Sequence, residues 1–366
     1  MKVVQYTIAV AFVGLFTTMA VAEKPLEIVH AVKLPKGKYG YRGGMGDIIE
    51  LKDGSLLFAY SPPNQGIMSV KSTDGGKTWS EPEQMFANPK PPAKGYYVLP
   101  GFLRLKNGDI MISYIYGTFP TTPYYGHNYY RRSADEGKTW TEQFCMTPHP
   151  GYYIVHNDRL TMLSSGRILA PAEYKAHYPS TRDHNGYVGS AFFSDDGGFS
   201  WQVSKNTVDM IPVEFQEAHA VELKDKRVLL FARTYSDHPA KAYSSDGGNT
   251  WSKGEMIEEL PMPHASFPSV VRIPSTGDLL FVWGSAISQV KGSPGPPRRS
   301  RLSTAISKDE GKTFEHIRHV VDDPEDDFGY QCVDFVGKDK KTALIGFHKR
   351  DGLHVAHIPV DWFYGK

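Results

Sequence analysis

The stretch Ser72-Thr73-Asp74-Gly75-Gly76-Lys77-Thr78-Trp79 decides the fold, because four more copies of it follow along the chain. Each copy reads S-x-D-x-G-x-[TS]-[WF], and the copies begin at Ser72, Ser133, Ser194, Ser244 and Ser307. A motif that returns at such intervals indicates a repeated supersecondary unit that packs on its neighbours. We expect Ser and Asp to hydrogen-bond backbone amides of a tight turn, glycine to supply a positive φ, and the aromatic ring to fill an apolar gap to the next unit. The motif is therefore expected to be scaffold.

A second pattern precedes each copy and occurs once more near the C-terminus. It consists of two apolar strands joined by a polar turn such as Asp53-Gly54 or Asn107-Gly108. Its instances span residues 48–60, 102–114, 160–173, 221–233, 270–283 and 333–348. Six hairpins with five turn motifs predict an all-β fold, a six-bladed β-propeller whose last blade takes a strand from residues 26–34. The content of 13% aromatic residues, 35 Gly and 26 Pro agrees with a turn-rich β protein.

The first residues resemble an export signal rather than a part of the fold. Met1-Lys2 precedes an apolar run over residues 8–16, and Ala20-Val21-Ala22 forms an A-x-A cleavage site. We therefore expect a signal peptide at 1–22, a propeller at 23–366, and a secreted or periplasmic protein without a retained membrane anchor. The two cysteines, Cys145 and Cys332, leave open whether a disulfide forms.

Ionisable and aromatic side chains are expected to gather on one face of the propeller. In each blade the inner strand begins on this face and the second strand ends there. Residues at or near these positions, together with His127 in the loop after the second hairpin, include Arg42, Asp47, His156, Asp158, Arg159, Glu173, Glu217, Arg233, Tyr330 and His348. Polar groups that converge on a concave opening are typical of a ligand site.

With these features the chain resembles the sialidase (neuraminidase) superfamily, and most closely its bacterial BNR/Asp-box branch. Sialidases bind a sugar carboxylate with three arginines and attack with a tyrosine that a glutamate activates. Glu217 stands sixteen residues before Arg233 across one hairpin, and Arg299 precedes the fifth Asp box as the third arginine does. Tyr330 opens the last inner strand, where the family places its nucleophile. The resemblance thus implies Tyr330 as nucleophile, Glu217 as its base, and Arg42, Arg233 and Arg299 around the carboxylate.

The chemistry of these residue types agrees with the implied roles. A carboxylate on the substrate would repel a carboxylate nucleophile, so a neutral phenol is a better attacking group. A phenol with a pKa near 10 needs an adjacent base, which Glu217 would supply. Arginine suits the planar, bidentate capture of a carboxylate.

The sequence departs from the family pattern at two places. The family's first arginine lies in an F-R-I-P motif, whereas this chain has Arg42 two residues before the matching position. The loop 60–68 lacks the aspartate that protonates the leaving group. The remaining proton donors near the opening are Asp47, Asp158, Glu173, His127 and His156, and Arg159 is a further candidate for substrate binding.

Two other functions stay open on the sequence alone. Some propeller polysaccharide lyases resemble this layout, and there His127 or His156 would act with Tyr330 while Arg233 neutralises a uronate. A glycan-binding propeller without catalysis is the other. No two histidines have i,i+4 or H-x-H spacing, so we expect no metal or cofactor, and a net charge of +1 gives no argument for nucleic acid. We expect a monomeric, sialidase-like exo-glycoside hydrolase that acts on an acidic glycan.

Overall fold

The computed structural model describes residues 26–38, 40–90, 95–117, 126–149, 151–175, 186–264, 266–289 and 297–366. The expected signal peptide at 1–22 lies outside this part of the chain. Within the described residues no helix has the length and apolar character needed to cross a membrane.

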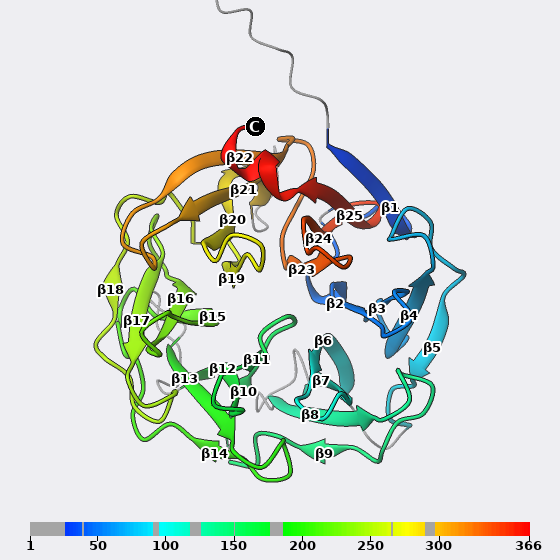
Figure 1. Cartoon of the computed structure of the whole chain (residues 1–366), viewed down its shortest axis with the longest axis horizontal. Coiled ribbons are helices and arrows are strands. Elements are labelled where there is room, and N and C mark those ends of the chain that lie inside the picture. Colours follow the sequence, from blue (N-terminus) through cyan, green and yellow to red (C-terminus); the bar gives the residue numbers. More distant parts are fainter. Residues whose placement is uncertain are drawn as a thin grey trace, which may run out of the picture.

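Six sheets are arranged radially around a central axis, so the predicted six-bladed propeller is confirmed (Figure 1). Blades 1 and 2 contain β2 (Asp47–Glu50), β3 (Leu56–Tyr60), β4 (Ile67–Ser72) and β5 (Glu83–Phe86), then β6 (Tyr96–Arg104), β7 (Ile110–Gly117), β8 (Gly126–Ser133) and β9 (Phe144–Cys145). Blade 3 contains β10 (Tyr153–Ile154), β11 (Thr161–Met162), β12 (Ile168–Lys175), β13 (Tyr187–Ser194) and β14 (Gln202–Val203). Blades 4 and 5 contain β15 (Gln216–Glu222), β16 (Val228–Arg233), β17 (Ala240–Ser244) and β18 (Glu255–Met256), then β19 (Ser269–Arg272), β20 (Leu279–Ser288), β21 (Arg298–Ser307) and β22 (Glu315–Asp322).

The sixth blade closes the ring with strands from both ends of the described chain. It contains β23 (Cys332–Val336), β24 (Thr342–Lys349) and β25 (Gly352–Pro359), and β1 (Glu27–Lys33) pairs antiparallel with β25 as its outermost strand. The expectation that residues 26–34 complete the last blade is therefore confirmed. Two short 3₁₀ helices, η1 (Arg42–Gly44) and η2 (Val360–Tyr364), flank these strands.

Each Asp box is a self-contained turn between the third and fourth strands of a blade. In the first box the Ser72 hydroxyl donates to Asp74 at 2.8 Å and accepts the Gly76 amide at 2.8 Å. Asp74 also accepts the amide and hydroxyl of Thr78 at 2.9 and 2.6 Å. The other four boxes repeat the Ser–Asp and glycine amide contacts. The predicted structural role of the motif agrees with this geometry.

The aromatic residue that ends each box packs between two blades. Trp140 of blade 2 joins an apolar cluster with Leu57 and Ile67 of blade 1, and Trp251 of blade 4 joins one with Leu169 of blade 3. The ring thus fills the gap to the preceding blade. Because these clusters span neighbouring blades, each interface has its own core, and the chain can exceed the length of a single-core domain.

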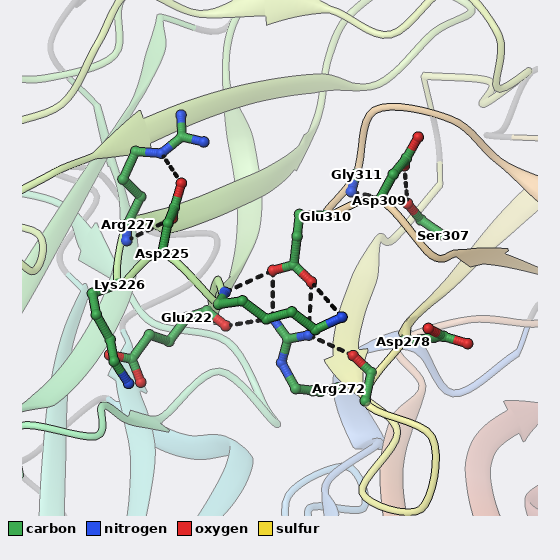
Figure 2. A network of polar contacts seen from close by, with 12 residues as sticks. Glu222, Asp225, Lys226, Arg227, Arg272, Asp278, Ser307, Asp309, Glu310 and Gly311 are labelled. Atoms are coloured by element: carbon green, nitrogen blue, oxygen red, sulfur yellow. Dashed lines mark hydrogen bonds and ion pairs between the residues drawn. The ribbon is translucent and has the colours of Figure 1, made fainter.

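In two Asp boxes a glutamate also links its own blade to the preceding one, and we call each such set of contacts an inter-blade clamp. In blade 5 Glu310 forms a paired contact with Arg272 of β19 at 2.9 and 2.8 Å, and accepts the Lys224 amide of blade 4 at 2.8 Å (Figure 2). Arg272 further donates to the carbonyl of Glu222 in blade 4. Blade 2 repeats this arrangement on blade 1, with Glu136, Arg104, Lys52 and Glu50 in the same roles. These clamps fix neighbouring blades at the Asp-box end.

The antiparallel order of the strands separates two faces. Inner strands run toward the Asp-box end and second strands return, so the starts of β15 and β23 and the end of β16 lie at the opposite face. There the segment before β11 crosses the channel: the Asn157 amide donates to the carbonyls of Gly46 and Tyr330 at 3.0 and 2.9 Å. The Asp158 carboxylate accepts the Val333 amide at 2.9 Å. Blade 3 is thereby tied to blades 1 and 6.

Candidate active site

Tyr330, Glu217 and Arg233 form the centre of the candidate site. The Tyr330 hydroxyl donates to Glu217 Oε1 at 3.0 Å, and Arg233 Nη1 lies 3.1 Å from Glu217 Oε2. Tyr330 precedes β23, Glu217 lies on β15 and Arg233 ends β16. Residues 113 positions apart thus meet because blades 4 and 6 both open on this face.

The backbone at the two central residues has an uncommon conformation. Tyr330 has a φ of 48° and Glu217 a φ of 49°, both in the left-handed region that side chains other than glycine rarely adopt. At Glu217 the β15–β16 register shifts between Gln216 and His219. Such strain persists only where the surrounding structure holds it, and it is common at functional sites. A bulge here turns the Glu217 side chain toward Tyr330.

The ring of Tyr330 is held in a stack. It lies on the ring of Phe267 with centroids 4.4 Å apart, and the guanidinium of Arg159 covers Phe267 at 4.0 Å. The guanidinium of Arg299 lies 4.8 Å from the Tyr330 centroid. Phe267 was not among the residues predicted from the sequence, since it has no chemical signature beyond an apolar ring.

Charges around the pair move the two pKa values apart. Burial raises the pKa of Tyr330 to about 12, and the charge of Glu217 adds to this rise against the effect of Arg299 and Arg233. Burial also opposes ionisation of Glu217, but Arg233, His156 and Arg299 outweigh it and lower its pKa to about 2. Near neutral pH the site therefore holds a phenol beside a carboxylate, the protonation states that a base-assisted phenol requires.

The other two expected arginines are organised by Asp327, which the sequence analysis missed. Arg42 Nε and Nη2 donate to the two oxygens of Asp327 at 2.9 and 2.8 Å, and the Arg299 amide donates to the same carboxylate at 2.7 Å. Burial disfavours the Asp327 carboxylate, but its hydrogen bonds from Arg42 and the charges of Arg42 and Arg299 hold its pKa well below its usual range. Asp327 lies three positions before Tyr330, and that proximity was the one available signal in the sequence.

Arg42, Arg233 and Arg299 lie close enough to influence one another and Tyr330. The charge of Arg233 acts on Arg42, that of Arg42 acts on Arg299, and each of the three interacts with Tyr330. Three guanidinium groups beside a phenol suit an anionic ligand better than a metal cation.

His156 and Glu173 extend the site from blade 3. Glu173 accepts the Glu217 amide at 3.2 Å, and His156 Nε2 lies 3.5 Å from Glu173 Oε1. The His156 ring lies 6.0 Å from that of Tyr330. Both side chains are buried, and both ring nitrogens of His156 lack a hydrogen-bond partner among the described residues.

The remaining sequence candidates have other surroundings. Asp47 is buried and accepts the amides of Ile48 and Phe102 at 2.8 and 2.7 Å, which ties blade 1 to blade 2. Arg159 is fully buried beneath Phe267 and donates to the carbonyl of Pro268 at 2.5 Å.

Asp158 and His127 also contact the backbone. Asp158 bonds to blade 6 as described above, and burial raises its pKa to about 7. His127 hydrogen-bonds through Nδ1 to the Thr147 carbonyl, and burial lowers its pKa. The structure therefore brings Tyr330, Glu217, the three arginines, His156 and Glu173 together, whereas Asp47, Asp158, Arg159 and His127 make contacts within and between blades. Cys145 and Cys332 are free thiols.

Cavity volume alone does not identify this site. A cavity of about 670 Å³ lies on the Asp-box face, between Gly54 and Gly75 of blade 1 and His357 of blade 6. Another of about 640 Å³ opens beside Arg42 and is lined by Tyr41, Gly44, Pro62, Pro63, Tyr96 and Tyr97. The second adjoins Arg42 and carries aromatic walls, which suit the apolar face of a sugar. The chemistry thus favours the face of Tyr330 over the larger cavity.

Comparison with known families agrees with this architecture. The family described as "BNR repeat-like domain" matches residues 98–333, and the BNR/Asp-box repeat matches residues 70–81. The chain belongs to the BNR-repeat branch of the sialidase superfamily. A sialidase from Micromonospora viridifaciens is 26% identical over 298 residues, which cover 74% of this chain and 43% of that protein. A sialidase from Bacteroides fragilis is 24% identical, over 62% of this chain and 39% of its own. The chain thus spans less than half the length of these two relatives.

Solved structures share the fold at low identity. A protein of unknown function from Dyadobacter fermentans has a TM-score of 0.69 at 22% identity, with 92% of this chain and 98% of that chain covered. The intramolecular trans-sialidase from Ruminococcus gnavus, solved with oseltamivir carboxylate, has a TM-score of 0.65 at 14% identity, with 92% and 97% covered. At these identities the similarity shows a shared propeller fold and nothing further.

Proposed function

We propose that this BNR-repeat protein is a sialidase-like exo-glycoside hydrolase that releases a terminal acidic sugar through a tyrosine nucleophile. The observation that carries the proposal is the 3.0 Å hydrogen bond from the Tyr330 hydroxyl to the buried Glu217 carboxylate. The two sialidases to which the sequence is similar support the same class of reaction.

The arginines give the substrate its orientation in this proposal. Arg42, Arg233 and Arg299 bind the sugar carboxylate, and their planar groups favour paired hydrogen bonds to its oxygens. Asp327 holds Arg42 in place before the substrate arrives, which reduces the ordering cost of binding. The anomeric carbon then lies over the Tyr330 hydroxyl.

The proton of Tyr330 passes to Glu217 as the phenol oxygen bonds to the anomeric carbon and the glycosidic bond breaks. In the resting site the pKa of about 2 for Glu217 and about 12 for Tyr330 oppose this transfer. A bound carboxylate shares the positive field of Arg233 and Arg299, so it raises the pKa of Glu217 and makes this carboxylate a stronger base. Water then attacks the anomeric carbon: its hydroxyl stays on the sugar, its proton goes to the group that protonated the leaving oxygen, and Glu217 returns its proton to the Tyr330 oxygen as that bond breaks.

The leaving oxygen also needs a proton, and we propose that His156 with Glu173 supplies it. Glu173 accepts the Glu217 amide at 3.2 Å, and the His156 ring lies 6.0 Å from the Tyr330 ring. Asp47 and Asp158 are engaged with backbone amides.

A trapped intermediate tests the nucleophile. The probe is an acidic sugar with fluorine beside the anomeric carbon and a good leaving group on it, so that attack proceeds and hydrolysis slows. We expect mass spectrometry to find the sugar on the peptide that contains Tyr330, and no adduct in Tyr330→Phe. An adduct on Glu217, or turnover of sialosides without any adduct, would overturn the proposal.

An elimination reaction is the second candidate, because both nitrogens of the buried His156 ring are without hydrogen-bond partners in the described structure. In this reaction the His156 imidazole removes a proton from a uronate while Tyr330 protonates the leaving oxygen. The products separate the two reactions, since elimination leaves an unsaturated sugar that absorbs in the near ultraviolet. Such absorbance with uronate polysaccharides, abolished in His156→Ala and kept in Glu217→Gln, would favour the lyase.

A further inference from the structure

The seam that closes the propeller carries a cluster of possible metal ligands. His30 lies on β1 and His354 on β25, and the two residues are direct partners in the antiparallel register. Their rings stack with centroids 4.1 Å apart. Asp351 lies in the hairpin between β24 and β25, and its Oδ1 is 2.9 Å from His354 Nε2. Three ligand-type side chains, from β1, from β25 and from the hairpin before β25, thus meet at one point.

The geometry of these atoms fits a small transition-metal ion. One ligand atom from each of the three residues lies within 4.8 Å of the others. Tetrahedral zinc with bonds of about 2.0–2.2 Å places its ligands about 3.3 Å apart. Metal binding therefore requires the His30 and Asp351 side chains to turn out of the stacked arrangement so that their ligand atoms reach that spacing. Two imidazoles and a carboxylate are donors that zinc accepts, whereas calcium and magnesium prefer oxygen alone.

The backbone around the cluster lets the His30 side chain lie close to the hairpin that carries Asp351. Gly352 has a φ of 145°, and a Cβ there would lie 2.8 Å from His30 Nε2 and 2.0 Å from the Val32 carbonyl oxygen. The β1–β25 register also shifts between His30 and Val32, where a bulge re-aims the strand. His354 is buried and stacks against Phe347, which limits its rotation.

We propose that His30, Asp351 and His354 bind one Zn²⁺-type ion, with water completing the coordination, and that the ion fastens β1 to the last blade. The site is distinct from Tyr330 and Glu217 and does not depend on the proposed hydrolase activity. The spacing of histidines along the chain could not indicate it, because its ligands come from opposite ends of the sequence.

The same side chains also form bonds with one another. His30 Nε2 lies 3.2 Å from the Asp351 carbonyl, and His354 contacts the Asp351 carboxylate. A purely structural cluster would stabilise the seam equally with and without metal. The experiment must therefore measure the metal itself and its effect on β1.

The test uses the full chain without a histidine tag, stripped of metal by a chelator and dialysed against micromolar ZnCl₂. We expect about one zinc per chain, a rise in Tm of about 3–5 °C at a hundredfold excess over Kd, and slower hydrogen exchange in β1. His30→Gln and Asp351→Asn should each lower zinc affinity at least tenfold. The control is His357→Gln. His357 lies on β25 like His354, but its ring contacts the Gly76 carbonyl, so this variant should bind zinc as the unaltered protein does.

The outcomes are distinct. Zinc content below half an ion per chain, or equal affinity in His30→Gln, Asp351→Asn and the unaltered protein, would overturn the proposal. If a variant fails to fold, the exchange of β1 amides in the unaltered chain decides, since a metal elsewhere would leave β1 unprotected. Sialidase activity is expected to be the same in the zinc-loaded and stripped protein.

Discussion

The Asp-box face and the Tyr330 face hold their carboxylates by different means. On the Asp-box face Asp74 is bound by Ser72 and Thr78, which lie two and four residues away. On the other face Asp327 is bound by Arg42, 285 positions distant, and Glu217 by Tyr330, 113 positions distant. The first arrangement forms wherever the local sequence occurs, whereas the second exists only when the ring is closed.

The electrostatic causes differ in the same way. The partly exposed carboxyl of Asp135 has its pKa lowered to about 2 chiefly by hydrogen bonds from Thr139 in its own turn. Glu217 reaches about the same pKa although burial opposes it, because the charges of Arg233, His156 and Arg299 prevail. A lowered pKa thus comes from a local turn in one case and from an assembled charge cluster in the other.

Removing the Tyr330 hydroxyl should produce the largest effect. Tyr330→Phe deletes one oxygen, so activity is expected to fall at least about 10³-fold while the fold is kept. The matched control is Tyr364→Phe, because the Tyr364 hydroxyl also donates to a carboxylate, Asp278, at 2.8 Å, but at the Asp-box end. Kinetics on a sialoside and thermal unfolding check both variants. Equal activity in both would remove the functional distinction between the faces.

The same contrast explains which features could be predicted from sequence. Boxes and hairpins are local patterns, so the six blades and the closing strand followed from them. Tyr330, Glu217 and Arg233 were placed together through family resemblance, and the structure gives their distances. Asp327 and Phe267 were not predicted as site residues, because their contacts depend on loops from different blades. The backbone contacts of Asp47 and Asp158 likewise cross blades, so sequence position alone could not separate them from Glu173.

Neutralising Asp327 should affect binding more than chemistry. Asp327→Asn loses the paired contact that holds Arg42, so we expect KM for an acidic sugar to rise about 10–100-fold with a smaller change in kcat. Removing a buried charge partner also lowers stability, by up to about 3 kcal/mol. Asp309→Asn in the fifth Asp box is the control and should lower stability without changing KM. A normal KM in Asp327→Asn would contradict the role of Arg42 in binding.

The pH dependence of stability should reflect buried histidines around the site and seam. Burial lowers the pKa of His348 to about 3, below the value near 6.5 of the unfolded chain. Between these values the unfolded state takes up a proton that the native state does not, so stability falls as pH drops below 6.5. When the pH falls from 7.5 to 5, the free energy of unfolding of His348→Gln should therefore decrease by about 2 kcal/mol less than that of the unaltered protein. Denaturant unfolding at both pH values measures this free energy. The same decrease in the variant and in the unaltered protein would contradict a neutral, buried His348.

The two inter-blade clamps should show the smallest and most local effect. Glu136 and Glu310 join different pairs of blades through the same set of contacts, so Glu136→Gln and Glu310→Gln should each cost about 1 kcal/mol of unfolding free energy. Because the clamps share no residues, the double variant should be additive to within about 0.5 kcal/mol. Activity should stay unchanged, as in the exposed control Glu81→Gln. A loss of activity in either variant, or a strongly non-additive double variant, would mean that the Asp-box end transmits strain to Tyr330 and that the two faces are not independent.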